Sequence, residues 1–154
     1  MIYIGLDPGS ASGAYGIINH DEDFIACGDI LSVDGRVDAI WLYEKIMSWV
    51  NVYDTAMIAV ESVHSMPKQG IASTAKFMRA AGVIEAVAAL TRYPYTLVTP
   101  QAWKKYHGLI GSAKGASLEA ARLHWDEADL RLVKHHGRAD ALLMALWLKR
   151  KNHG

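Results

Sequence analysis

Cysteine and long apolar runs are nearly absent from this chain. Cys27 is the one cysteine, so no disulfide forms within the chain, and no cysteine and histidine spacing suits a structural zinc site. No apolar run reaches the length of a membrane span. The first residues lack the basic segment, apolar stretch and cleavage site of a secretory signal. These absences argue against disulfide-rich secreted proteins and membrane proteins, and we expect a protein of the reducing cytoplasm.

Net charge is also lacking, but the charges that are present are unevenly distributed. Residues 1–61 hold two basic and ten acidic residues, whereas residues 62–154 hold fourteen basic and six acidic ones. An acidic centre beside a basic surface suits a metal-dependent enzyme of nucleic acids, although ordinary solvated faces give the same count. The length of 154 residues, 51% of them apolar, predicts a single globular domain over 1–154.

The spacing of apolar and turn-forming residues predicts a mixed α/β fold. We expect strands over 2–7, 12–19, 24–33, 55–62 and 95–98, and helices over 37–50, 71–92, 100–109, 114–125 and 137–151. Three strands in a meander, followed by parallel strands with helical crossovers, are the layout of an RNase H-like fold. The sequence therefore predicts a five-stranded mixed sheet, part antiparallel and part parallel, flanked by helices.

Acidic residues close two of these strands. Asp7 ends the first and Glu61 ends the fourth, so parallel neighbours would bring both carboxylates to the same edge of the sheet. The last helix adds Asp140 and, four residues earlier on the same face, His136. Acids gathered at one point need a positive partner, and oxygen-rich sites suit Mg²⁺ or Mn²⁺. A pair of such ions suits phosphodiester hydrolysis.

Each of these residues also has a simpler interpretation. Asp7 before Pro-Gly is a common turn former, and Asp140 near the start of a helix is favoured by the helix dipole. His136 fits an ordinary surface position. The combination at matching topological positions favours the metal site.

Four segments of the chain resemble the RuvC-type Holliday junction resolvases, and more closely the small RuvC-like proteins of bacteriophages and prophages. The segments are "IGLDPGSASGAYGII", "AVESVHSMPKQGIASTAKF", "VTPQAWKK" and "KHHGRADALLMA". The resemblance implies a crossover junction endodeoxyribonuclease with Asp7, Glu61 and Asp140 as catalytic acids. It implies two Mg²⁺ ions per active site, with Mn²⁺ as a substitute, and action in a bacterial or phage-infected bacterial cell.

The chain departs from the family at one ligand position. Many relatives carry an aspartate three residues before the final acid, where this chain has Gly137. Since some relatives use histidine as the fourth ligand, we assign that role to His136, with His135 as the alternative. Relatives often place an aromatic residue on the loop after the second acid, and residues 62–64 occupy that stretch here.

Basic residues that follow the fourth strand are candidates for contacts with DNA phosphates. In the resembling family the stretch around 104–114 supplies phosphate-binding lysines. The candidates are Lys68, Lys76, Lys104, Lys105, Lys114 and Arg138.

The predicted helix 71–92 is apolar nearly all round from Ala80 to Leu90, interrupted by Gly82 and Glu85. One sheet face cannot cover such a helix, so we expect a homodimer built on it, with Val83 and Val87 on its outward side. Two symmetric active sites would suit a four-way junction.

Other functions stay open at this point. An RNase H-fold nuclease acting on flaps or RNA–DNA hybrids has the same acids, and a catalytically weak DNA-binding relative would explain Gly137. A kinase or chaperone ATPase encloses nucleotide between two such domains, whereas a length of 154 residues predicts only one domain.

Overall fold

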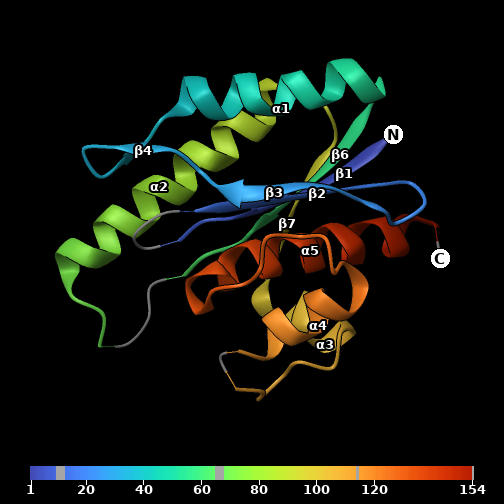
Figure 1. Cartoon of the computed structure of the whole chain (residues 1–154). Helices are drawn as coiled ribbons and strands as arrows, with labels where there is room; N and C mark the ends of the chain where they lie inside the picture. The colour runs from blue at the N-terminus through green and yellow to red at the C-terminus, as the bar shows by residue number, and fades with distance from the viewer. Residues whose placement is uncertain (10–12, 65–67, 114, 154) are drawn as a thin grey trace.

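The computed structural model describes residues 1–9, 13–64, 68–113 and 115–153, and a five-stranded sheet lies at its centre (Figure 1). The strand order is β3-β2-β1-β6-β7, with β1 antiparallel to β2 and parallel to β6. The bounds are β1 (Ile2–Asp7), β2 (Ala14–Asn19), β3 (Phe24–Asp29), β6 (Ala56–Glu61) and β7 (Tyr95–Val98). The mixed, RNase H-like sheet predicted from the sequence is confirmed.

The predicted strand 24–33 is wrong in its second half. It ends at Asp29, and a separate two-stranded ribbon follows, made of β4 (Ser32–Val33) and β5 (Arg36–Val37). The two residues between them, Asp34 and Gly35, both have positive φ, 51° and 73°. That backbone matches the twist of a tight hairpin, and Asp-Gly is a preferred sequence for it.

Two helices cover one face of the sheet. They are α1 (Ala39–Tyr53), whose first turn is capped by the side chain of Asp38, and α2 (Ile71–Leu90). Alternate residues of β1, namely Ile2, Ile4 and Leu6, are fully buried on this side. Period-two alternation therefore leaves Tyr3, Gly5 and Asp7 for the opposite face.

The opposite face carries the rest of the helices (Figure 1). They are α3 (Pro100–Tyr106), α4 (Ala116–His124), the short 3₁₀ helix η1 (Val133–His135) and α5 (His136–His153). Residues 141–148 of α5 are all buried, because the helix lies between the sheet and the layer of α3 and α4.

Paired glycines let α5 lie against the backbone of the sheet. Gly5 of β1 is the register partner of Gly16 of β2. A Cβ on Gly5 would overlap the carbonyl oxygen of Ala141, and one on Gly16 would collide with the backbone of Leu142. This contact brings the first turns of α5 to the end of β1, where the candidate site lies.

Candidate active site

Two parallel strands place the first two acids. The register of β1 and β6 pairs Leu6 with Val60, so Asp7 and Glu61 are the next residues along neighbouring strands. Both side chains follow the alternation to the face that α5 covers. Asp140 comes from α5, where Gly137 lacks a side chain: a Cβ there would stand 3.2 Å from Oδ2 of Asp7. The structure thus brings the three predicted acids together.

Burial disturbs the ionisation of all three carboxyl groups, and neighbouring charge adds to this for Asp7 and Glu61. Burial raises the pKa of Asp7 well above its usual range, and the charges of Glu61 and Asp140 raise it further. Burial also raises the pKa of Glu61, and it raises the pKa of Asp140 to about 6. The side chains of Asp7 and Glu61 also share a hydrogen bond. The cluster is therefore one in which burial and like charge disfavour the ionised carboxylates.

Helices α3 and α4 supply the groups that partly offset this charge. Nε1 of the fully buried Trp103 donates a hydrogen bond to Oε2 of Glu61, 2.7 Å away. The hydroxyl of Ser117 donates to Asp140, and this contact lowers the carboxyl's pKa. The ammonium of Lys104 lowers the pKa of all three acids. Trp103 lies in the motif "VTPQAWKK", but the motif alone gave no role to it, and nothing in the sequence marked Ser117.

The two adjacent histidines lie in different surroundings. His136 and Asp140 line a cavity of about 230 Å³ together with residues of α3 and α4, among them Lys104 and Ser117. His135 is 4% exposed, and its Nδ1 accepts a hydrogen bond from the N–H of Leu132 at 3.3 Å. Burial lowers the pKa of His135. His136 thus shares a cavity with Asp140, whereas His135 is buried.

Divalent metal fits the chemistry of this cluster. The donors are carboxylate oxygens, which Mg²⁺ and Mn²⁺ prefer, and a cation would offset the burial that disfavours their ionised forms. Within the described residues, no three His, Cys, Asp or Glu side chains already stand in the arrangement of a metal site.

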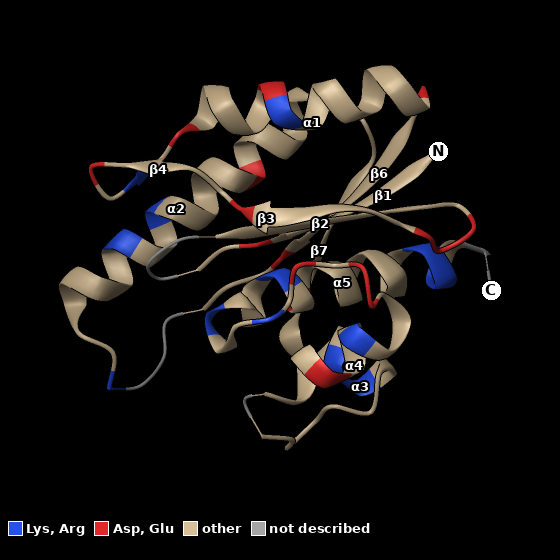
Figure 2. Ribbon diagram, viewed as in Figure 1, with Lys and Arg blue, Asp and Glu red and all other residues tan. Residues whose placement is uncertain are grey.

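Basic residues lie on both α2 and α3 (Figure 2), and the predicted DNA-binding residues differ in exposure. Lys68 and Lys76 are exposed before and on α2, and Lys105 is exposed on α3, whereas Lys104 is half-buried beside the acids. Lys114 lies outside the described residues, as do residues 65–67 in the loop after Glu61.

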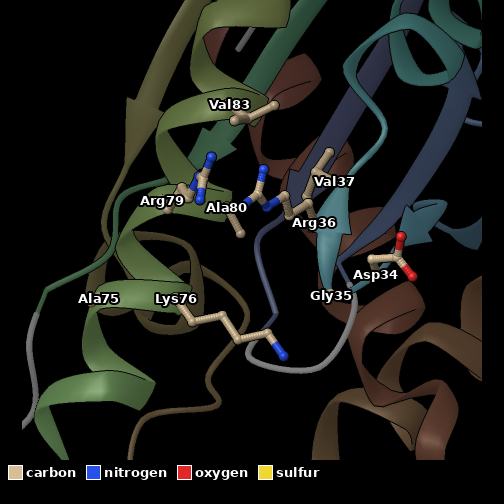
Figure 3. A pocket seen from close by; sticks show the side chains of 9 residues that line it. All are labelled: Asp34, Gly35, Arg36, Val37, Ala75, Lys76, Arg79, Ala80 and Val83. Atoms are coloured by element: carbon tan, nitrogen blue, oxygen red, sulfur yellow. The ribbon is translucent and has the colours of Figure 1, made fainter.

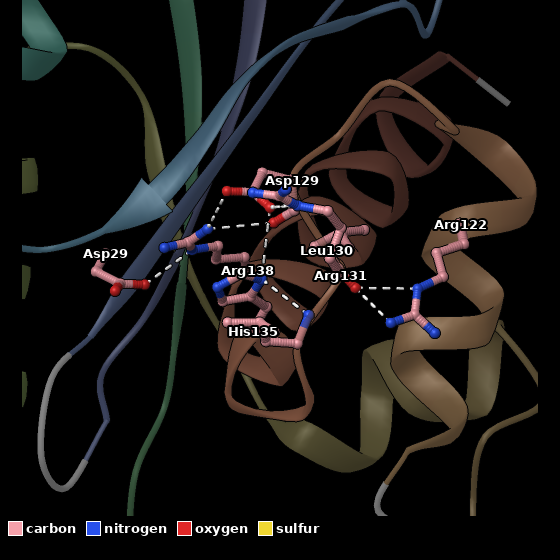
Figure 4. A network of polar contacts seen from close by, with 8 residues as sticks. Asp29, Arg122, Asp129, Leu130, Arg131, His135 and Arg138 are labelled. Carbon is pink, nitrogen blue, oxygen red and sulfur yellow. Dashed lines mark hydrogen bonds and ion pairs between the residues drawn. The ribbon is translucent and has the colours of Figure 1, made fainter.

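Arg138 is already engaged within the protein (Figure 4). Its guanidinium contacts Oδ1 of Asp29 at 2.9 Å and Oδ2 of Asp129 at 3.2 Å, and its side chain is 14% exposed. These ion pairs fasten the end of β3 to the first turn of α5. We therefore leave Arg138 out of the DNA contacts proposed below.

The fold and the strand-end acids define the class of RNase H-like divalent-metal nucleases. The family described as crossover junction endodeoxyribonuclease RuvC matches residues 3–146, and the chain belongs to this RuvC family. It is thereby a crossover junction endodeoxyribonuclease, the hydrolase that resolves Holliday junctions, as its motifs predicted. The closer resemblance to phage proteins stays a prediction.

Solved structures agree on the fold. The Thermus thermophilus RuvC structure aligns with a TM-score of 0.72 and 19% identity, covering 100% of this chain and 97% of that one. T. thermophilus RuvC in complex with Holliday junction substrate aligns with a TM-score of 0.71 and 18% identity over the same shares. No curated protein matches the chain. In the described part of the chain, no helix has the length and apolar character needed to cross a membrane.

Proposed function

We propose that this chain resolves Holliday junctions by hydrolysing two symmetric phosphodiester bonds, with Asp7, Glu61, Asp140 and His136 as the active site of each subunit. The observation that carries the proposal is the buried carboxylate cluster, in which Asp7 is disfavoured as an anion by its burial and by two acidic neighbours. Such a cluster is costly to the fold unless a cation serves it. We place the activity in the bacterial cytoplasm, where the DNA is.

Asp7, Glu61 and Asp140, completed by His136, would hold two Mg²⁺ ions, or Mn²⁺ in their place. When bound, the ions supply positive charge to the scissile phosphate and lower the pKa of water. Trp103 and Ser117 hold Glu61 and Asp140 in position through their hydrogen bonds. In the reaction a water oxygen bonds to phosphorus and the bond to O3′ breaks, which leaves a 3′-hydroxyl and a 5′-phosphate.

DNA phosphates would contact the lysines on both sides of the acids. Lys68 and Lys76 lie on the α2 side, and Lys104 and Lys105 lie on the α3 side. We include Lys114 from the sequence. Such contacts supply sequence-independent affinity and position the duplex arms.

A homodimer would hold two active sites at fixed separation. From residue 82 onward, the exposed positions of α2 are Gly82, Ala86, Ala89 and Leu90, which lie at helical spacing and carry no charge. A Cβ on Gly82 would meet nothing within 4 Å, so a second helix has room to approach closely there. We propose that this side of α2 pairs with its copy about a twofold axis.

Cleavage of labelled substrates, with and without Mg²⁺, tests the proposal. We expect paired nicks in a four-way junction only with Mg²⁺, and little cutting of linear duplex. Faster cutting of a flap or an RNA–DNA hybrid would instead favour the alternative nuclease. Tight junction binding without cutting in either Mg²⁺ or Mn²⁺ would identify a binding protein in which Gly137 has cost the activity.

A further inference from the structure

A basic pocket lies away from the carboxylate cluster, between the β4–β5 ribbon and the N-terminal half of α2 (Figure 3). It has a volume of about 390 Å³. Arg36 comes from the ribbon. Lys76 and Arg79 come from α2, where they lie three residues apart on one side of the helix. None of the acids assigned to catalysis lines it. The pocket is therefore a separate feature of the surface.

These three cations face no acidic partner among the residues that the structure describes. Within the described residues, no hydrogen bond or ion pair joins Arg36, Lys76 or Arg79 to a carboxylate. Asp34 also lines the pocket, but its side chain is turned away from them (Figure 3). Three like charges that converge on one pocket repel each other, and an anion bound among them would relieve that repulsion.

The ribbon fixes the position of this charge. Its Asp34-Gly35 turn has positive φ at both residues, which only a few residue types tolerate, so the hairpin is short and well defined. Nζ of Lys76 lies 3.1 Å from where a Cβ on Gly35 would stand. Glycine at this position therefore serves both the turn and the close approach of the Lys76 ammonium.

We propose that this pocket binds a phosphodiester group of the DNA, distant from the bond that is cut. Two guanidinium groups offer forked donors that match phosphate oxygens, and the ammonium adds a point charge. The pocket is open to solvent, and its three positive charges can surround one backbone phosphate of a junction arm. This inference rests on the proposed function, because the arm belongs to the junction that the active site cuts.

Junction binding at several salt concentrations tests the pocket, using the Arg36→Gln/Arg79→Gln double variant. We expect its Kd for a labelled four-way junction to rise about tenfold near 0.1 M salt. The slope of log K against log salt should fall by about one, the contribution of one phosphate contact. The Mg²⁺-dependent cleavage rate at saturating junction should stay within about twofold, since neither arginine is near the acids.

Arg92→Gln is the matched control, because it removes one exposed arginine from the loop that directly follows α2 at its other end. It should leave both Kd and slope unchanged. Unchanged binding by the double variant would overturn the proposal. Its conversion to a monomer in sedimentation would also overturn the proposal, because the pocket would then be a subunit contact. The chemical shifts of the Gly35 and Arg36 amides in the wild-type protein give a test that needs no variant. They are measured as junction is added without metal, and the absence of any change in them also overturns the proposal. A wild type that binds through this pocket but cuts nothing would refute the function and leave the pocket standing.

Discussion

At the scale of one residue, burial beside two other acids makes the ionised form of Asp7 unfavourable. The Asp7→Asn variant removes that charge and almost no volume. We expect junction cleavage to fall about 100-fold or more, while junction binding without metal stays within about threefold. The metal-free variant should melt at a higher temperature than the wild type at pH 8, because it no longer buries an ionised group.

Glu61→Gln and Asp140→Asn are the companion variants and should behave alike in cleavage. If the Asp7→Asn variant cleaves at the wild-type rate, Asp7 has no role in the mechanism. Cleavage loss together with lost binding would show a damaged fold instead, and circular dichroism separates the two.

The adjacent histidines give the second prediction at this scale. His136→Ala should lower the cleavage rate about 10- to 100-fold with little change in stability. His135→Ala should do the reverse, costing about 1–3 kcal/mol of stability, because it empties a buried position and leaves the N–H of Leu132 without its partner. Single-turnover cleavage and urea unfolding measure both. The opposite ranking would mean that His135 is the ligand.

The pKa of Asp140, about 6 in the folded chain, gives a pH prediction. Because this value is raised, the stability linked to the group is fully present below its unfolded pKa and is lost as pH rises through about 6. His107, His124 and His135 have lowered pKa values and act in the opposite direction, so the wild type alone is not informative. In EDTA, the Tm advantage of Asp140→Asn over the wild type should grow by roughly 5 °C between pH 4.5 and 7.5. A constant difference would contradict the raised pKa.

At the scale of elements, α3 connects the hydrophobic core to the carboxylate cluster. It begins at Pro100 after Thr99, whose side chain caps the helix, and this start points Trp103 at Glu61. Trp103→Phe should lower cleavage about tenfold, as expected when a carboxylate loses a positioning contact. The acidic limb of the kcat/KM profile should also shift to higher pH, because the indole lowers the pKa of Glu61.

A shift in that limb separates positioning from simple loss of packing. Trp125→Phe is the control, because Trp125 is equally buried but donates its indole N–H to the backbone of Glu22, far from the acids. It should lower stability and leave the pH profile unchanged. Equal profiles for both variants would show that Trp103 acts through packing alone.

The sequence predicted the order of the elements and the three acids, because strand-end carboxylates follow from topology. It missed the contacts made by residues distant in the chain. Trp103 and Ser117 reach acids 42 and 23 residues away, and nothing local to either residue signals that contact. It also missed the Asp34-Gly35 turn, because the apolar run before it favoured one strand up to residue 33, whereas β3 ends at Asp29.

At the scale of the whole molecule, the proposed dimer depends on α2. The sequence suggested Val87 as an outward residue, but it is 2% exposed and packs in the chain's own core, so a charge there would damage the fold. Ala86 is the neighbouring exposed position. We expect Ala86→Lys to yield a monomer, because an unpaired ammonium would be buried where the two copies meet.

Sedimentation velocity at several concentrations measures this, with Asn51→Lys, an exposed change on α1, as the control that stays dimeric. The monomer should still gain thermal stability from Mg²⁺, since each chain carries its own acids, but it should lose paired cutting of junctions. A wild type that is monomeric at high concentration would refute the dimer, and an unchanged Ala86→Lys dimer would move the interface elsewhere.

The contact of Gly5 and Gly16 with α5 has a consequence for how tolerance to mutation will be distributed. A side chain can change rotamer to relieve a clash, but a helix backbone resting on a strand backbone cannot. In a saturation library both positions should therefore accept glycine alone, as strictly as we expect of the proposed catalytic acids. Positions 5 and 16 would then score as essential in a selection for junction cutting, although neither touches the substrate. A measurement of protein abundance alongside activity would separate them, because variants there are lost from the folded pool and variants at Asp7 are not.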